Sequence, residues 1–285
     1  MALSADTFDA DSSDLVETVI QPRRGWIAVN WKELYDFREL LYYLALRDVK
    51  VRYKQTVLGV AWAVIQPLFT MLIFTLIFGR FAKIPSEGLP YSVYVFAGLI
   101  PWTLFSSGVT AAGQSLVMQQ NMLTKIYFPR LFIPTATLGA FLVDAAVSFA
   151  LYALVLAFHG VVPSWQIVYL PGFLALTVMA SLGLGYTLAA MIVVYRDIRH
   201  IIPFLMQILM FASPVIYPAR LVPTHYQWVL ALNPLCGIID GFRSSILGTP
   251  WNPVTLALSL TVTPVLFVFG LYYFRKTERL FADIA

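Results

Sequence analysis

Charged residues and cysteine are both scarce in this 285-residue chain, and each scarcity excludes a class of protein. Only 12% of the residues are charged, against roughly 25% in ordinary soluble domains, while 59% are hydrophobic. A soluble fold could not cover that much apolar surface. Cys236 is the only cysteine, so the chain can form no internal disulfide and no thiolate cluster for a metal.

Motifs for nucleotide hydrolysis and for metal-dependent catalysis are missing as well. A P-loop ends in a lysine directly after a glycine, and none of the six lysines follows a glycine. His159, His200 and His225 fall in predicted loops or span ends, and no His-Glu-x-x-His spacing occurs. We therefore predict no catalytic residue, no metal site and no cofactor in this chain. If ATP is used, a separate partner subunit must hold it together with Mg²⁺.

Long apolar stretches are abundant, and they predict an all-α integral membrane protein. A spanning helix needs about 20 apolar residues to cross roughly 30 Å of hydrocarbon. Five stretches reach that length, whereas a sixth, residues 201–217, is shorter and is followed by several prolines. The region between the fifth and sixth spans is expected to dip into the bilayer without crossing it. The predicted spans are residues 55–79, 91–116, 131–158, 167–194, 201–217 and 254–274.

Basic residues beside the spans predict their orientation, because short cytoplasmic segments carry the excess of Lys and Arg. Of the 19 basic residues, 15 fall in residues 23–54, in the second and fourth loops and after the last span. The four on the opposite side are Arg80, Lys83, Arg220 and Arg243. This split predicts six spans with both termini in the cytoplasm, and it explains the net charge of +4 without a nucleic-acid partner.

The segment before the first span divides into a tail and a helix. Residues 1–24 are acidic near their start and predict a disordered tail. In residues 25–54, Leu34, Phe37, Leu41 and Leu44 follow a 3-4-3 spacing that builds one apolar helix face. We expect this amphipathic helix to lie along the cytoplasmic membrane surface, as a simple anchor or as a docking site for a partner. Residues 55–285 form the predicted transmembrane domain.

One face of the first span combines amides and aromatic rings. Gln55, Gly59, Trp62, Gln66 and Phe69 are spaced 4, 3, 4 and 3 residues apart and so share a helix face. Sugar C–H faces pack on rings and sugar hydroxyls need hydrogen bonds, so this face suits a glycan. Packing between helices, with the glutamines bonded to backbone, is the alternative.

Asp144 is the one clear acid within a predicted span. An intramembrane carboxylate can belong to a proton relay, as in ion-coupled transporters, or accept hydrogen bonds from a neighbouring helix. Because no charged partner stands near it in the sequence, the structural role is favoured.

Several motifs together resemble a known family. The run from Arg47 to Gly59, continued by Trp62 and Gln66-Pro67, resembles permeases of type 2 ABC exporters that move polysaccharides, and the Wzm-type O-antigen and teichoic-acid permeases are the most similar. The other matching blocks are Tyr127-Phe128-Pro129-Arg130, Tyr195-Arg196-Asp197-Ile198, residues 213–218 and Asn233-Pro234, in consistent order over residues 34–280.

The resemblance implies a homodimer in the inner membrane, docked on two copies of a cytoplasmic P-loop ATPase and exporting lipid-linked glycan. O-antigen is the first expectation, with teichoic acid or capsule as variants. An ion-coupled secondary transporter and a membrane-bound transferase are the competing classes. The resemblance assigns a substrate path to Trp62, Gln66 and Phe69, to which the shared helix face adds Gln55. It assigns an exit gate of short re-entrant helices to Pro218, Asn233 and Pro234. The residues that it implies for ATPase coupling are Leu41, Lys125, Tyr127, Phe128, Pro129 and Arg130.

Overall fold

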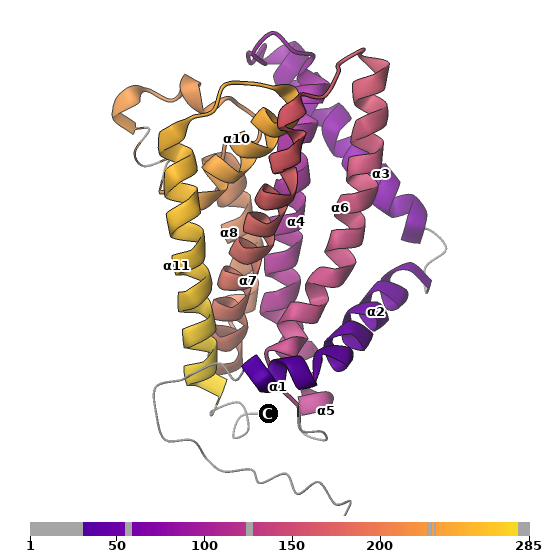
Figure 1. Ribbon diagram of the computed structural model, residues 1–285, viewed down its shortest axis with the longest axis vertical. Helices are drawn as coiled ribbons and strands as arrows, with labels where there is room; N and C mark the ends of the chain where they lie inside the picture. The colour runs from indigo at the N-terminus through magenta and orange to yellow at the C-terminus, as the bar shows by residue number, and fades with distance from the viewer. Residues whose placement is uncertain are drawn as a thin grey trace, which may run out of the picture.

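A computed structural model describes residues 31–54, 59–123, 128–226, 228, 230 and 232–278. Within these ranges the chain is helical and contains no strand, so the predicted all-α class is confirmed. Figure 1 shows long helices packed side by side, with α1, α5 and the last turn of α11 at the lower end and α10 at the upper end. The helices are α1 Trp31–Asp36, α2 Arg38–Lys54, α3 Gly59–Phe74 with its π-helical continuation η2 Thr75–Phe81, α4 Tyr91–Met118, α5 Gln120–Leu123, α6 Phe132–Phe158, η3 Trp165–Tyr169, α7 Leu170–Val194, α8 Ile198–Ala212, η4 Ala219–Leu221, η5 Thr224–Tyr226, α10 Pro234–Leu247 and α11 Pro253–Thr277.

Among the described residues, five helical segments are long and apolar enough to cross a membrane. They are residues 61–81, 91–118, 132–158, 165–194 and 253–277, and each overlaps a predicted span. The chain is therefore a multi-pass membrane protein. A turn joins the third and fourth spans, since residues 159–164 are not helical and Gly160 takes a left-handed φ of 66°.

The predicted fifth span is the exception, and the count of six spans stays a prediction. Its helix, α8, has 15 residues and ends at Ala212, so it is only ~22 Å long at 1.5 Å per residue. Pro214 follows two residues later and cannot donate a backbone hydrogen bond to continue the helix. The chain then runs on without helix through Ser213–Tyr217, most of which is buried.

The spans differ widely in how much of their surface the protein itself covers. In the most apolar stretch of α4, 72% of the residues are buried, against 6% for residues 61–81. The α4 helix sits in the centre of the bundle and contacts α6 and α7 extensively. Gly185 of α7 permits that contact, since a Cβ there would lie 2.7 Å from the Cβ of Ala112. The first span instead crosses the outside of the bundle (Figure 1).

The apolar face expected before the first span exists, but protein covers part of it. The helix breaks at Phe37, so α1 and α2 form in place of one helix. Leu34, Phe37 and Leu41 pack with Leu44 around a small core built with Phe132 and Ala136 of α6. The α2 helix climbs obliquely along α6 instead of standing apart from the bundle (Figure 1).

Candidate functional site: a polar groove inside the bundle

The lower half of α4 carries a polar stripe that the other helices leave uncovered. From residue 101 to residue 116, the side chains that are not buried recur at helical spacing, whereas their neighbours are buried. Polar groups on a membrane helix turn toward a partner or an aqueous path, because hydrocarbon cannot satisfy them. The polar members of this stripe are Thr103, Ser106, Ser107, Thr110 and Gln114.

The stripe forms one wall of a groove that consists of two adjoining cavities. The first, of about 470 Å³, also touches Trp62 and Gln66 of α3 and Asp144 of α6. The second, of about 650 Å³, extends toward the lower end along α2 and α6. Both cavities are lined by Arg52, Ser107 and Phe141, which therefore mark the place where they join. Volumes of this size suit several sugar-sized groups.

Most hydroxyl groups of the groove donate their hydrogens to carbonyls of their own helices. Thr110 Oγ1 donates to the carbonyl of Ser106 at 2.7 Å, and Thr103 Oγ1 donates to Ile100 at 3.1 Å. On α6, Thr137 and Ser148 bond in the same way to Pro134 and Asp144, at 2.8 and 2.9 Å. A hydroxyl that donates locally keeps lone pairs that can accept a hydrogen bond from something in the groove.

Asp144 has a charged partner, contrary to what its sequence surroundings indicate. Arg52 Nη2 lies 2.6 Å from Asp144 Oδ2, and the guanidinium sits 4.6 Å from the ring centroid of Phe141. The Tyr53 hydroxyl donates to the other carboxylate oxygen. Burial, reinforced by Asp144, raises the pKa of Tyr53 to about 12, so the phenol keeps the proton that it donates. The partner was missed because α2 brings it from 92 positions earlier in the chain.

Two of the four residues predicted to line a substrate path are found at the groove. Trp62 and Gln66 border the groove as expected. Phe69 is 59% exposed but does not line either cavity, and Gln55 lies outside the described residues. On the rest of α3, Met71 is buried in the main core, whereas Pro67 lines the first cavity beside Gln66.

The residues predicted to couple to an ATPase lie at the lower end, but several of them face inward. Phe128 and Pro129 are buried, and Phe128 packs in a core with Tyr186 and Phe274. Arg130 Nη1 donates to the Glu278 carbonyl at the end of α11. These contacts fix the loop to the bundle. Lys125 and Tyr127 lie outside the described residues.

The residues predicted to form the exit gate lie at the opposite, upper end. Asn233 caps α10 by accepting from Leu235 N at 3.1 Å, and its amide donates to Ser213 Oγ at 2.9 Å. Pro234 is the first residue of α10, and its carbonyl accepts from Ser259. Pro218 is buried just beyond the broken end of α8. The exit gate stays a prediction.

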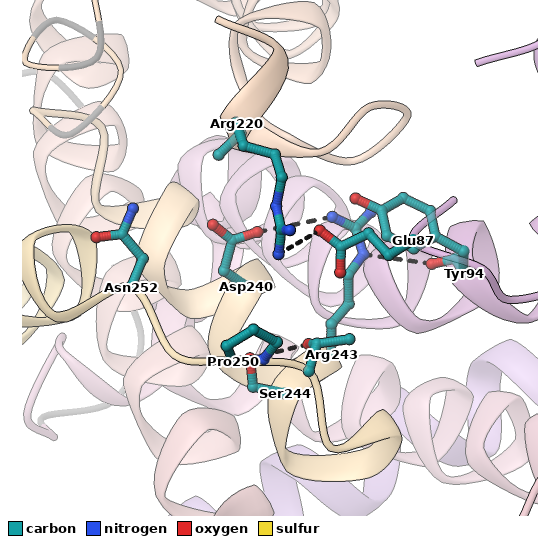
Figure 2. Close-up of a pocket in the computed structure, with 10 residues that line it drawn as sticks. Glu87, Tyr94, Arg220, Asp240, Arg243, Ser244, Pro250 and Asn252 are labelled. Atoms are coloured by element: carbon teal, nitrogen blue, oxygen red, sulfur yellow. Dashed lines mark hydrogen bonds and ion pairs between the residues drawn. The ribbon is translucent and has the colours of Figure 1, made fainter. Parts of the chain in front are cut away.

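A charged cluster holds this upper end together, and Figure 2 shows it around a small cavity of about 60 Å³. Arg220 Nη2 lies 2.9 Å from Glu87 Oε1, and Arg243 Nη1 lies 3.7 Å from Asp240 Oδ1. Burial raises the pKa of Asp240 to about 6 although Arg243 lowers it, and the Glu87 carboxylate adds to the rise.

Arg243 is the centre of that cluster. Its side chain is 3% exposed and donates to the carbonyls of Pro214, Val215 and Tyr94. It also lies 3.9 Å from the Tyr94 ring centroid. Carbonyls of the non-helical segment after α8 are thus satisfied by a side chain of α10, as buried backbone requires. Gly98 leaves the room, because a Cβ there would lie 2.6 Å from Arg243 Nη2.

Fold and groove together define a class. A helical membrane bundle that leaves a polar stripe of its central span uncovered, beside aromatic and amide side chains, has the architecture of a subunit that conducts a polar cargo. Comparison with known families gives the particular group. A profile of the ABC-2 type transporter family matches residues 39–247, and the chain belongs to that family.

The chain also matches individual relatives over most of their length. The chain is 31% identical to the O-antigen export system permease protein RfbA of Myxococcus xanthus, over 75% of this chain and 82% of the relative. It is 25% identical to a protein of the same name from Klebsiella pneumoniae, over 86% and 95%. It is also 25% identical to the polysialic acid transport protein KpsM of Escherichia coli, over 83% and 92%.

Proposed function

We propose that this chain is the permease subunit of an ATP-driven exporter that moves lipid-linked polysaccharide across the cytoplasmic membrane. The observation that carries the proposal is the uncovered polar stripe of α4, faced by Trp62 and Gln66. Hydroxyls, amides and an exposed indole suit a sugar chain, whose surface alternates between hydroxyl groups and C–H faces. The O-antigen export permeases among the relatives make an O-antigen the first candidate cargo.

Ion-coupled transport is less consistent with the groove. A carboxylate that relays protons must exchange partners with the groove, whereas both oxygens of Asp144 are held by residues of α2, one by Arg52 at 2.6 Å and the other by the Tyr53 hydroxyl. The ion pair instead fastens α2 to the middle of α6.

A second copy of the chain would close the groove. The first span exposes apolar side chains along much of its length, and 6% of its most apolar stretch is buried. A homodimer that buries this surface would place two grooves face to face and form one channel between them. The exposed apolar side chains are Ile65, Phe69, Leu72, Ile73, Leu76, Ile77 and Phe81.

Energy would come from a separate ATPase docked at the lower end, which we place in the cytoplasm together with both termini. The printed sequence has no P-loop lysine. At this end α2 exposes Tyr42 and Tyr43, each more than 60%, and Arg47 links α2 to Gln119 at 2.9 Å, just before α5. A docked partner could therefore move α2 and α5 together. Isolation of an active transporter that contains no ATPase subunit would contradict this arrangement.

Deletion of the gene tests the function directly. We expect lipid-linked polymer to accumulate inside the cells and to leave them again when the intact gene is restored. Restoration with Trp62→Ala should recover membrane insertion but reduce export at least about tenfold, because the ring that packs on sugar C–H faces is gone.

Trp165→Ala is the matched control, since Trp165 is 72% exposed but lies outside both cavities. Equal export by the two variants would show that Trp62 serves packing. A deletion strain that retains normal surface glycan and accumulates no polymer would contradict the proposed function itself.

A further inference from the structure

The groove carries very little charge for a passage through a membrane protein. Among the described residues that line its two cavities, only Asp48, Arg52 and Asp144 are charged. Arg52 is the single cation, and it is already paired with Asp144 at 2.6 Å. Asp48 is paired with Arg47, outside the lining, at 2.8 Å. The lining therefore has a formal charge of −1 and offers no excess positive charge.

The uncharged part of the lining likewise offers more hydrogen-bond acceptors than donors to a ligand. The hydroxyl hydrogens of Thr103, Ser106 and Thr110 on α4 bond to carbonyls of their own helix. Across the groove, Thr137 and Ser148 do the same. What these groups present to a ligand is lone pairs. Only a few side chains, such as Trp62 and the glutamines, present N–H donors.

This lining distinguishes two kinds of polymer. A neutral sugar carries hydroxyls that donate as well as accept, so it can satisfy lone pairs along the wall. An ionised carboxylate or phosphate group only accepts and finds few donors there. A polyanion would also hold several charges at once within the roughly 30 Å of the membrane's hydrocarbon, where a charge without a partner is costly.

We propose that the glycan that occupies this groove is uncharged along its backbone. The inference rests on the proposed function and deepens it, because it names the class of polymer that the chain accepts. The names of the relatives do not decide the point, since they include transport proteins for O-antigen and for polysialic acid.

Binding of two matched probes tests the inference on the full-length chain in lipid nanodiscs. The probes are an end-labelled neutral oligomer of glucose and an end-labelled oligogalacturonate of the same length. At low ionic strength we expect the neutral oligomer to bind at least about tenfold more tightly, and the difference to shrink as salt screens the groove. Equal or tighter binding of oligogalacturonate would overturn the inference while leaving a glycan permease in place. Failure of both probes to bind would count against the proposed function as well.

A charge-adding variant makes the test independent of any single sugar. Thr110→Lys places a cation on the α4 stripe and should strengthen oligogalacturonate binding about tenfold, with a steeper dependence on salt. Val162→Lys adds the same charge at an 85% exposed position in the turn after α6, outside both cavities. If the two variants bind oligogalacturonate equally, the groove does not select by charge and the inference is wrong.

Discussion

The groove and the upper charged cluster both place polar groups inside a membrane protein, yet they satisfy them in opposite ways. In the groove, most hydroxyls bond within one helix, as Thr110 does to Ser106, whereas Asp144 bonds across to α2. In the upper cluster, bonds run between elements, and Arg243 of α10 joins α4 to the segment after α8. Bonds within a helix leave neighbouring helices free to separate, whereas bonds between helices hold them at fixed positions. The groove can therefore admit a cargo while the cluster maintains the architecture around it.

The sharpest test of this difference removes the Arg243 side chain. Arg243→Leu leaves the carbonyls of Pro214 and Val215 and the Asp240 carboxylate without their buried partner. We expect a loss of about 3–5 kcal/mol in unfolding free energy, because each buried carbonyl left without its donor costs about 1–3 kcal/mol. The measurement is the thermal unfolding midpoint of the purified protein in detergent.

The neighbouring pair provides the control. Arg220 is 61% exposed in its ion pair with Glu87, and exposed pairs contribute about 1 kcal/mol or less. Arg220→Leu should therefore shift the midpoint only slightly. If the two variants are equally stable, Arg243 does not hold the upper end together.

A second test uses pH, because burial places the pKa of Asp240 at about 6, above its ordinary value of 3.8. Between these values the native state keeps a proton that the unfolded chain has lost, so stability falls as pH rises through this range and then levels off. The shift of about two pKa units corresponds to about 3 kcal/mol at most. Arg243, Glu87 and Arg220 face the carboxyl and set the size of the effect.

Asp240→Asn removes the titrating group and should remove this pH dependence between pH 4 and pH 7. Unfolding midpoints of the parent and the variant, measured across that range, should converge at low pH and diverge at neutral pH, where the variant is the more stable. Parallel curves would show that Asp240 ionises with its ordinary pKa.

Much of the fold could be predicted from the sequence, because spanning helices leave a local signal. The five long spans follow from apolar runs that can be read directly in the sequence. The fifth span could not be settled in this way. The apolar run continues past Pro214, whereas α8 ends at Ala212. The point at which the helix can end depends on whether another element supplies donors for the carbonyls that follow, as Arg243 does for Pro214.

The site was only half predictable for a similar reason. Trp62 and Gln66 follow from their spacing in the first span. The same kind of signal exists in the second span, where Thr103, Ser107, Thr110 and Gln114 have a 4-3-4 spacing that could have predicted the stripe. The pairing of Arg52 with Asp144 leaves no local signal, because it depends on the path of α2 along α6. In the sequence, Arg243 counts only as one of the four basic residues on the side opposite the cytoplasm. Its burial becomes visible only when α4, α8 and α10 are assembled.

The smallest expected change in stability comes from the groove, and it separates the two regions most directly. Thr110→Val keeps the shape of the side chain and removes only a hydroxyl that bonds within α4 at 2.7 Å. We expect less than about 1 kcal/mol of destabilisation, because no group on another helix loses a partner. Export should nevertheless fall, since the stripe loses an acceptor for sugar hydroxyls.

Thr187→Val is the matched control. Thr187 is also half-buried and makes the same bond within α7, to Gly183 at 2.9 Å, but it lies outside the groove. Unfolding midpoints and export rates measured on both variants would decide the matter. A large loss of stability in Thr110→Val, or equal export by the two, would mean that the α4 stripe is structural in the same sense as the Arg243 cluster.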